Sequence, residues 1–420
     1  MKEKYYPSLG ETVRSDVLDN GLTVFTVPRE GFSKVFAFYA VNYGGMDVRW
    51  KKGGRECSSP EGTAHFLEHK MFDMEEGSAD LMLAANGAQA NAFTSGDMTA
   101  YLFECTDRFE ENLDILLNFV NTPFFTPQSV EKEMGIISQE IGMCEDDPYW
   151  RAGHSLVESM FGAHALKNRT VGTKESISHI TDRVLTDCHS TFYVPSNMIL
   201  CVVGDVDHDA VTEAALRHTP RQRAEKAERW TGDAGVPFAM KETVSKMEIS
   251  RPVFSIGFRA DLPPGEPFLE CGILGDTASA AVLGPSSELY GEMYADGIIN
   301  GSFDFSFEMH EGAAYFEARG ESDRPRETAE RILEGMDRIK KNGIDPSIFS
   351  VIKKADMGGR IKELGSFEMT AWNICDLAFR GEDYLEFSSV YKDLTAEGAA
   401  GLLLDSVREE NMVLSVVEPV

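Results

Sequence analysis

The stretch His65-Phe66-Leu67-Glu68-His69 carries two histidines and a glutamate at helical spacing, and it decides how the rest of the chain is interpreted. On an α-helix, positions i and i+4 lie one turn apart on the same face, so both imidazoles can reach one ion while Glu68 projects beside them. The order H-x-x-E-H is a metallohydrolase half-site. The alternative is a surface helix with two solvated histidines, and a third ligand on another element would argue against it.

A third ligand should be an oxygen or nitrogen donor on another element, and a second predicted helix carries two glutamates. The segment from Thr126 to Cys144 starts with a threonine N-cap and a proline, and an Asp-Pro pair stops it just beyond its end. Glu133 and Glu140 lie two turns apart on one face of this helix. Their neighbours form an apolar stripe at helical spacing: Val130, Ile137 and Ile141. Carboxylates at the edge of a core need a partner charge, and catalytic zinc usually takes three protein ligands.

Taken together, the sequence runs resemble the insulinase/pitrilysin family of zinc metallopeptidases, which are inverzincins, and the chain length resembles the processing-peptidase branch. The matching runs, in the family's order, are Leu18–Val24, Gly44-Gly45, Gly62–Phe72, Asn91–Ser95, Thr99–Phe103 and Glu133-x6-Glu140. The exact run from His65 to Phe72 also resembles the zinc-bearing subunit of paired bacterial peptidases. Without the zinc motif, Asn91–Ser95 would be interpreted as an ordinary turn at a strand end.

The resemblance implies a role for each matching residue. The implied zinc ligands are His65, His69 and Glu140, with one Zn²⁺ per chain. Glu68 is implied as the general base, Glu133 as a supporting catalytic acid residue near the site, and Asn91 and Ala92 as an edge strand that pairs with the substrate backbone. The chemistry agrees, because zinc lowers the pKa of bound water to about 7 and a carboxylate can accept the proton.

An internal repeat predicts two related halves. Ile180–Val203 matches Leu394–Val417 without a gap, and both segments end in the pattern of a buried strand. At 420 residues the chain also exceeds what one hydrophobic core usually supports. We therefore expect a zinc-bearing domain over residues 1–220, a linker over 221–249 and a homologous domain without metal over 250–420.

The expected fold class is α+β. The resemblance implies two homologous domains, each with a mixed β-sheet and several helices, arranged as half of a clamshell. Residue patterns predict strands at Leu22–Val27, Val35–Val41, Gln89–Thr94, Ala100–Glu104 and Met198–Val203, and a helix at Arg108–Asn121.

The second half has lost the metal-site residues. In a loose register Gly359 replaces Glu140, and the region Leu269–Leu283 contains no histidine. The resemblance also implies an Arg/Tyr pair in this half that stabilises the substrate carbonyl, but Met293 and Asn300 stand at those positions. No Lys or Arg occurs between Arg259 and Arg319, so shifting the register cannot restore the arginine.

Two main interpretations follow. In the first, the chain is the zinc-bearing subunit of an endopeptidase, and a homologous zinc-less partner supplies the Arg/Tyr pair; a homodimer using another group, such as His310, is the competing assembly. In the second, the chain is a non-catalytic scaffold or a peptide-binding subunit of the same fold. The complete ligand set and Glu68 favour the first, since a structural metal site has no use for a general base.

Composition narrows the partners and the compartment. With 40 basic and 69 acidic residues the net charge is −29, which disfavours nucleic-acid binding. The acidity could attract basic peptides or only maintain solubility. Seven cysteines without a C-x-x-C pair favour reduced thiols and the cytoplasm. The resemblance to paired bacterial peptidases implies that this cytoplasm is bacterial. Neither an 18-residue apolar span nor a signal peptide is evident, so no membrane span is expected.

Overall fold

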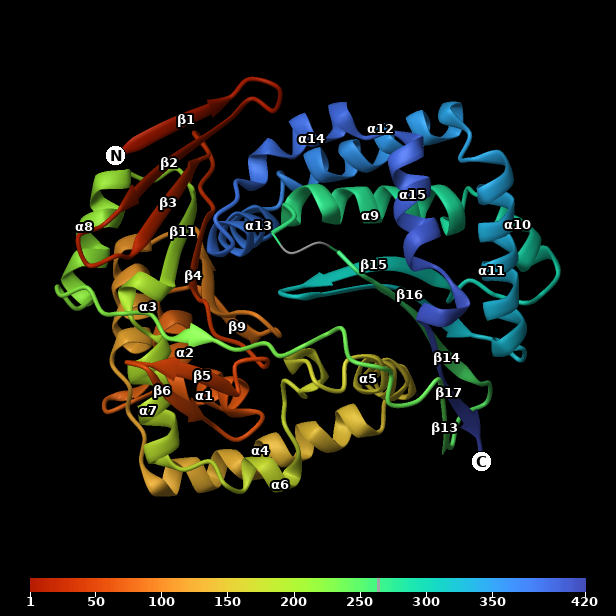
Figure 1. Cartoon of the computed structure of the whole chain (residues 1–420). Helices are drawn as coiled ribbons and strands as arrows, with labels where there is room; N and C mark the ends of the chain where they lie inside the picture. Colours follow the sequence, from red (N-terminus) through yellow and green to blue (C-terminus); the bar gives the residue numbers. More distant parts are fainter. Residues whose placement is uncertain (263–264) are drawn as a thin grey trace. The chain divides into compact units, whose positions relative to one another are not determined.

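The computed structural model describes residues 1–262 and 265–420 (Figure 1). The chain forms two compact units, and each is built from several segments. Unit 1 comprises Met1–Ile141, Asn168–Trp230 and Ile361–Leu385; unit 2 comprises Gly142–Lys167, Thr231–Arg360 and Glu386–Val420. The units are therefore not two consecutive stretches of sequence. The boundaries expected at 220 and 250 remain a prediction about the homologous halves.

Unit 1 contains a seven-stranded sheet in the order β1-β2-β3-β11-β4-β10-β9. Its strands are β1 Lys2–Tyr6, β2 Glu11–Val17, β3 Thr23–Pro28, β4 Val35–Val41, β9 Gln89–Thr94, β10 Thr99–Cys105 and β11 Met198–Gly204. Every residue of β4 and β11 is buried, as expected for apolar runs in the centre of a sheet. The strands and the helix expected from residue patterns are confirmed, with ends that differ by no more than one residue.

Unit 1 also contains helices on and around this sheet. They are α1 Thr63–Met71, α2 Ala79–Ala85, α3 Phe109–Asn121, α4 Pro127–Glu145, α6 Lys174–Ile177, α7 Asp182–Phe192, α8 His208–His218 and α13 Phe367–Phe379, with the 3-10 turn η2 Pro195–Asn197 before β11 and η3 Tyr384–Glu386 after α13. Two small sheets complete the unit: β5 Arg49–Lys52 with β6 Arg55–Ser58 and β12 Glu228–Arg229, and β7 Asp73–Met74 with β8 Gly77–Ser78. The unit boundary falls within α4, and the metal-site residues all lie on the unit 1 side.

Helix α13 comes from the second half of the sequence but packs on β4 and β11 of unit 1. Trp372 stacks on Phe93 of β9 with ring centroids 4.1 Å apart, and it also contacts Phe38 of β4. Cys375 is fully buried in the same interface. A distant segment therefore helps to hold the edge strand β9.

Unit 2 contains a five-stranded sheet in the order β13-β17-β14-β16-β15. Its strands are β13 Glu242–Met247, β14 Val253–Ala260, β15 Asp304–His310, β16 Ala313–Glu321 and β17 Met412–Pro419. Its helices are α5 Pro148–Met160, α9 Phe268–Leu283, α10 Glu288–Ala295, α11 Pro325–Asn342, α12 Pro346–Glu363, α14 Phe387–Asp393 and α15 Ala396–Ser406, with the 3-10 turns η1 Ala165–Lys167 and η4 Glu409–Asn411. Part of the predicted linker, β13, is thus a strand of this sheet.

Helix α5 is the reciprocal case, since it comes from the first half of the sequence and packs on β14 and β17. Leu156 and Met160 lie against Gly257 of β14, where a Cβ atom would come within 2.3 Å of the Met160 side chain. The glycine in the strand thus makes room for the helix.

The predicted repeat is confirmed by the strand topology. The order β3-β11-β4-β10-β9 in unit 1 corresponds to β13-β17-β14-β16-β15 in unit 2, with one parallel pair at the same place in each. Thr181 caps α7 and Thr395 caps α15, each by accepting a backbone N–H three residues on. The two matching segments therefore form the same helix, 3-10 turn and central strand.

Two further observations concern the helices and the cysteines. Among the described helices, none combines the length and the apolar composition needed to cross a membrane. None of the seven cysteines is in a disulfide bond, and four of them are buried.

Candidate metal centre

Helix α1 is fixed at its start by a close approach of two glycines. Gly62 precedes the helix with φ +87°, and a Cβ atom there would lie 2.9 Å from the Cα atom of Gly172. Thr63 Oγ1 donates to the carbonyl of Pro60 at 2.6 Å. Only glycine adopts this conformation without strain and leaves room for the neighbouring backbone. The packing therefore sets where the helix carrying the H-x-x-E-H motif begins.

The motif residues are not solvated. His65 is 7% exposed and Glu68 is 8% exposed, and His69 is partly buried. The alternative of a surface helix with two solvated histidines is therefore wrong.

Three ligand atoms converge beside this helix. His65 Nε2 lies 3.4 Å from Glu140 Oε1, and His69 Nε2 lies 3.6 Å from Glu140 Oε2. One ligand atom from each of the three residues lies within 4.8 Å of the others. A tetrahedral zinc ion bound at 2.0–2.1 Å would hold its ligand atoms roughly 3.3 Å apart. The spacing and the His-His-carboxylate donor set both fit zinc.

Helix α4 presents Glu140 as the sequence predicted. Thr126 Oγ1 accepts from the N–H of Ser129 at 3.2 Å, and Ser129 Oγ accepts from the N–H of Thr126 at 3.3 Å. This reciprocal cap starts the helix just before Pro127. The apolar stripe is buried as expected, at 4% exposure or less: Val130, Ile137 and Ile141.

Glu133 holds His69 rather than the metal position. The Glu133 Oε1 atom lies 3.0 Å from His69 Nδ1. A proton on Nδ1 leaves the Nε2 lone pair directed toward Glu140, as carboxylates commonly do for metal-binding histidines. Burial lowers the pKa of His69, but the bond to Glu133 and the nearby carboxylates outweigh it and raise the pKa overall. The bond from His69 in turn lowers the pKa of Glu133, as a bond from His65 lowers that of Glu140.

Glu68 lies beside the three ligands without being one of them. Burial raises its pKa above the ordinary glutamate value, and a hydrogen bond from Thr94 partly opposes this. Thr94 Oγ1 donates to Glu68 Oε2 at 2.7 Å. One carboxylate oxygen, Oε2, is therefore held in place, and the proton acceptor would be the other oxygen, Oε1.

The sequence did not single out Thr94, although it lies in the predicted run Asn91–Ser95. In the turn that follows Thr94, the Asp97 carboxylate forms ion pairs with two arginines from distant segments, at 3.6 Å from Arg229 Nη2 and 3.2 Å from Arg380 Nη2. The spacing within the run gave no signal that its fourth residue reaches Glu68. Only the antiparallel pairing of β9 with β10 and the packing of α1 against β9 bring the two together.

Asn91 and Ala92 lie on β9, the terminal strand of the sheet. Both line a cavity of about 320 Å³ that also contacts the motif helix. The residues around it are Glu68, His69, Phe72, Ser78, Asp80, Ala90, Asn91 and Ala92. An edge strand with an open cavity next to the ligand cluster is a suitable place for an extended peptide.

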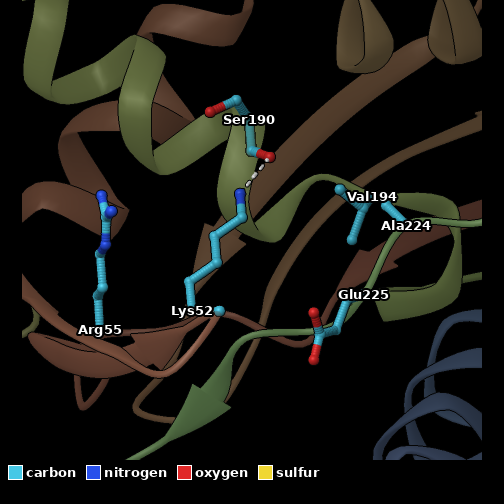
Figure 2. A pocket seen from close by; sticks show the side chains of 7 residues that line it. Lys52, Arg55, Ser190, Val194, Ala224 and Glu225 are labelled. Atoms are coloured by element: carbon cyan, nitrogen blue, oxygen red, sulfur yellow. Dashed lines mark hydrogen bonds between the residues drawn. The ribbon is translucent and has the colours of Figure 1, made fainter.

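A second cavity in unit 1, of about 470 Å³, contains none of the metal-site residues. Lys52 and Arg55 line it from the β5–β6 hairpin, and Glu225 lines it from another segment (Figure 2). The Lys52 ammonium donates to the carbonyl of Ser190 at 3.2 Å, near the end of α7. Lys52 thus binds a backbone carbonyl near the C-terminal end of a helix, which is a structural role.

Unit 2 has no counterpart of the metal cluster within the described residues. Arg360 of α12 pairs there with Asp276 of α9 at 2.6 Å and donates to the Tyr391 hydroxyl at 2.9 Å. Met293 is fully buried in α10, and Asn300 accepts from the Ser302 hydroxyl in a turn. Neither Met293 nor Asn300 offers a cation, as expected from the sequence.

We expect Glu140→Gln to weaken zinc binding more than Glu133→Gln. Structural zinc sites with four ligands bind with about 10–16 kcal/mol, so one ligand contributes roughly 3 kcal/mol, or about 100-fold or more in affinity. Loss of a residue that only orients a ligand costs about 10- to 100-fold. Competition with a chromophoric chelator measures both affinities, and Glu131→Gln, exposed on the same helix, is the matched control. Equal losses would mean that the two glutamates have been ranked wrongly.

Comparison with known proteins identifies the family. The model described as Insulinase (Peptidase family M16) matches residues 54–174, and that described as Peptidase M16 inactive domain matches residues 179–355. Uncharacterized zinc protease YmfH from Bacillus subtilis (strain 168) is 33% identical over 424 residues, covering 99% of this chain and 98% of that protein.

Two solved structures share the fold. An M16-like peptidase from Alicyclobacillus acidocaldarius gives a TM-score of 0.92 at 30% identity, covering 98% of this chain and 99% of that one. A protease from Helicobacter pylori gives 0.82 at 17% identity, covering 97% and 99%, a likeness of fold alone. The α+β fold expected from the sequence is confirmed, with a mixed sheet and several helices in each half. The chain belongs to the insulinase family of peptidases, family M16.

Proposed function

We propose that this chain is the zinc-bearing subunit of a metalloendopeptidase in which Glu68 is the general base. The observation that carries the proposal is a buried carboxylate directly beside three converging ligand atoms but outside the ligand set. A metal site that only stabilises a fold needs no such carboxylate. The names of relatives, which are called zinc proteases, support the same reaction class.

His65, His69 and Glu140 would hold one zinc ion, with Glu133 fixing the tautomer of His69. When bound, zinc makes a water molecule acidic near neutral pH and polarises a carbonyl group. The remaining chemistry falls to side chains of this chain.

Glu68 would accept a proton from the attacking water and then return it to the leaving amine. Its raised pKa suits this exchange, because a general base works best when its pKa approaches the working pH. Thr94 occupies Oε2, so Oε1 is the atom that would receive the proton.

The substrate would bind as an extra strand along β9. Asn91 and Ala92 lie on this terminal strand beside the ligand cluster, so a peptide that adds to its free edge brings its backbone to Glu68. Backbone pairing is largely independent of side chains, so the cavity walls must provide the selectivity.

A zinc-less homologous subunit would complete the active enzyme. This chain has no Lys or Arg between Arg259 and Arg319, and Met293 is part of the core of unit 2. We place the complex in the bacterial cytoplasm, because reduced thiols such as the seven found here are typical of that compartment.

Thr94→Val is expected to lower kcat about tenfold with little change in KM or zinc content. The substitution preserves shape but removes the donor to Glu68 Oε2, and hydrogen bonds to charged groups contribute about 1.5–3 kcal/mol. Thr94→Ser keeps the hydroxyl and should restore most of the activity. Steady-state kinetics on one peptide compare the three proteins. Equal losses in the valine and serine variants would assign Thr94 a packing role instead.

The function is tested by incubating a peptide library with the zinc-loaded chain, alone and with a zinc-less homologue from the same organism, and locating cleaved bonds by mass spectrometry. We expect internal cleavages that disappear with His65→Ala. The competing scaffold or peptide-binding role predicts bound, intact peptides under every condition. That result would refute peptidase activity.

A further inference from the structure

The cavity beside the metal centre has an unusual combination of walls. Its apolar side is Phe72, whose ring stacks on Phe119 at 5.1 Å and lies 6.1 Å from Tyr101. Because two buried aromatic neighbours hold this ring, the wall is rigid. The alanines of β9 that also line the cavity, Ala90 and Ala92, have small side chains. The cavity can therefore accept a long side chain with an apolar stem.

Acidic side chains line this cavity together with His69 of the metal site. Among the described residues that line it, Glu68 and Asp80 carry acidic side chains, and no Lys or Arg is present. The nearest lysine in sequence, Lys70, is buried and paired with Asp73. Glu68 is engaged with Thr94, whereas Asp80 is exposed and has a hydrogen bond from Ser78 to its Oδ1 atom. Asp80 is thus an exposed carboxylate whose Oδ1 atom accepts from Ser78 and whose Oδ2 atom would bind a ligand.

We propose that this cavity is a specificity pocket for a lysine or arginine side chain of the substrate, and that Asp80 selects it. The proposal rests on the proposed peptidase function and names its substrate class: peptides with a basic residue next to the cleaved bond. The methylene stem would lie along Phe72 while the cationic head reaches Asp80. An acidic side chain would instead meet two carboxylates and be excluded.

The position on β9 connects the pocket to the bound backbone. Asn91 and Ala92 line the same cavity, so a peptide paired with this strand would direct alternate side chains toward it. The net charge of −29 would attract the same peptides over longer distances.

Asp80 also has a simpler structural explanation, since acidic residues in the first turn stabilise a helix. Glu110 occupies the first turn of α3 and is a matched control without a place in the cavity. Asp80→Asn and Glu110→Gln should therefore lower the melting temperature by similar, small amounts. Only Asp80→Asn should alter the choice of substrate.

The test uses the zinc-loaded full chain, with its partner where activity requires it, and quenched fluorescent peptides that differ at one position flanking the cleaved bond. We expect kcat/KM for the arginine peptide to exceed that for the glutamine peptide about tenfold, a value discounted for the exposure of Asp80. Asp80→Asn should remove this preference and leave the glutamine peptide within twofold. Asp80→Arg should shift the preference to a glutamate peptide. An unchanged arginine preference in Asp80→Asn, or an equal loss on all peptides, would overturn the proposal.

A binding measurement separates this proposal from the proposed function. Fluorescence anisotropy with the same peptides and the zinc-loaded Glu68→Gln chain reports selection without catalysis. If the arginine peptide binds more tightly and Asp80→Asn abolishes that preference, the pocket is supported. This holds even if no protein cleaves any peptide, because a lack of cleavage would refute only the peptidase function. Binding that does not depend on peptide charge would overturn the pocket.

Discussion

Glu68→Gln is expected to reduce peptide hydrolysis by about 10²- to 10⁴-fold while leaving zinc content and melting temperature unchanged. The amide keeps the shape of the side chain and can still accept the hydrogen bond from Thr94. It cannot take a proton from water at neutral pH. Metal analysis and initial rates on a cleaved peptide measure the two effects separately.

Glu131→Gln is the control for this variant, because Glu131 is exposed on α4 and is not one of the three converging ligand residues. It should retain full activity. Near wild-type turnover by the Glu68→Gln protein would mean that another group activates the water. Loss of zinc from that protein would instead make Glu68 a ligand.

The chain alone is expected to cleave peptides about 10²- to 10³-fold more slowly than the chain with its zinc-less homologue. This is the cost of losing one donor to a developing oxyanion, and unit 2 offers no Lys or Arg between Arg259 and Arg319. Titrating the purified homologue into a fixed amount of this chain and following the initial rate measures the effect. The rate should saturate at one homologue per chain.

Mixing the homologue with Glu68→Gln chain should give no recovery, because the water-activating group belongs to this chain. Fast cleavage by the single chain, unaffected by the homologue, would contradict the two-chain hypothesis. A homodimer that uses His310 would then be the alternative, and His310→Ala would remove its activity. His310 ends β15, the counterpart of β9 in the second sheet.

The parts of the fold and site that the sequence predicted depend on local patterns. The H-x-x-E-H spacing, the caps of α4 and the apolar runs of β4 and β11 each lie within a few turns or one strand. Glu140 could be paired with the motif only through the family resemblance, since no local rule joins residues on different helices. The repeat was detectable because its matching segment runs without a gap.

The remaining features depend on contacts between distant segments. The packing of α13 on the first sheet and of α5 on the second could not be predicted, because helical periodicity marks a buried face but does not say which sheet that face contacts. Thr94 lies near Glu68 because β9 pairs with β10, and Asp80 lines the same cavity as Glu68 because the short helix α2 carries it there. The approach of Gly62 to Gly172 joins residues far apart in the chain. None of these could be predicted from spacing.

The central claim is that one zinc ion, held by His65, His69 and Glu140, makes this chain a peptidase. The most direct test is to titrate zinc into metal-free protein, with the homologue present, and to follow the initial rate of peptide cleavage. We predict no activity without metal and a linear rise that ends at one zinc per chain. Full activity in the metal-free protein, or a rise that requires two ions per chain, would contradict the claim.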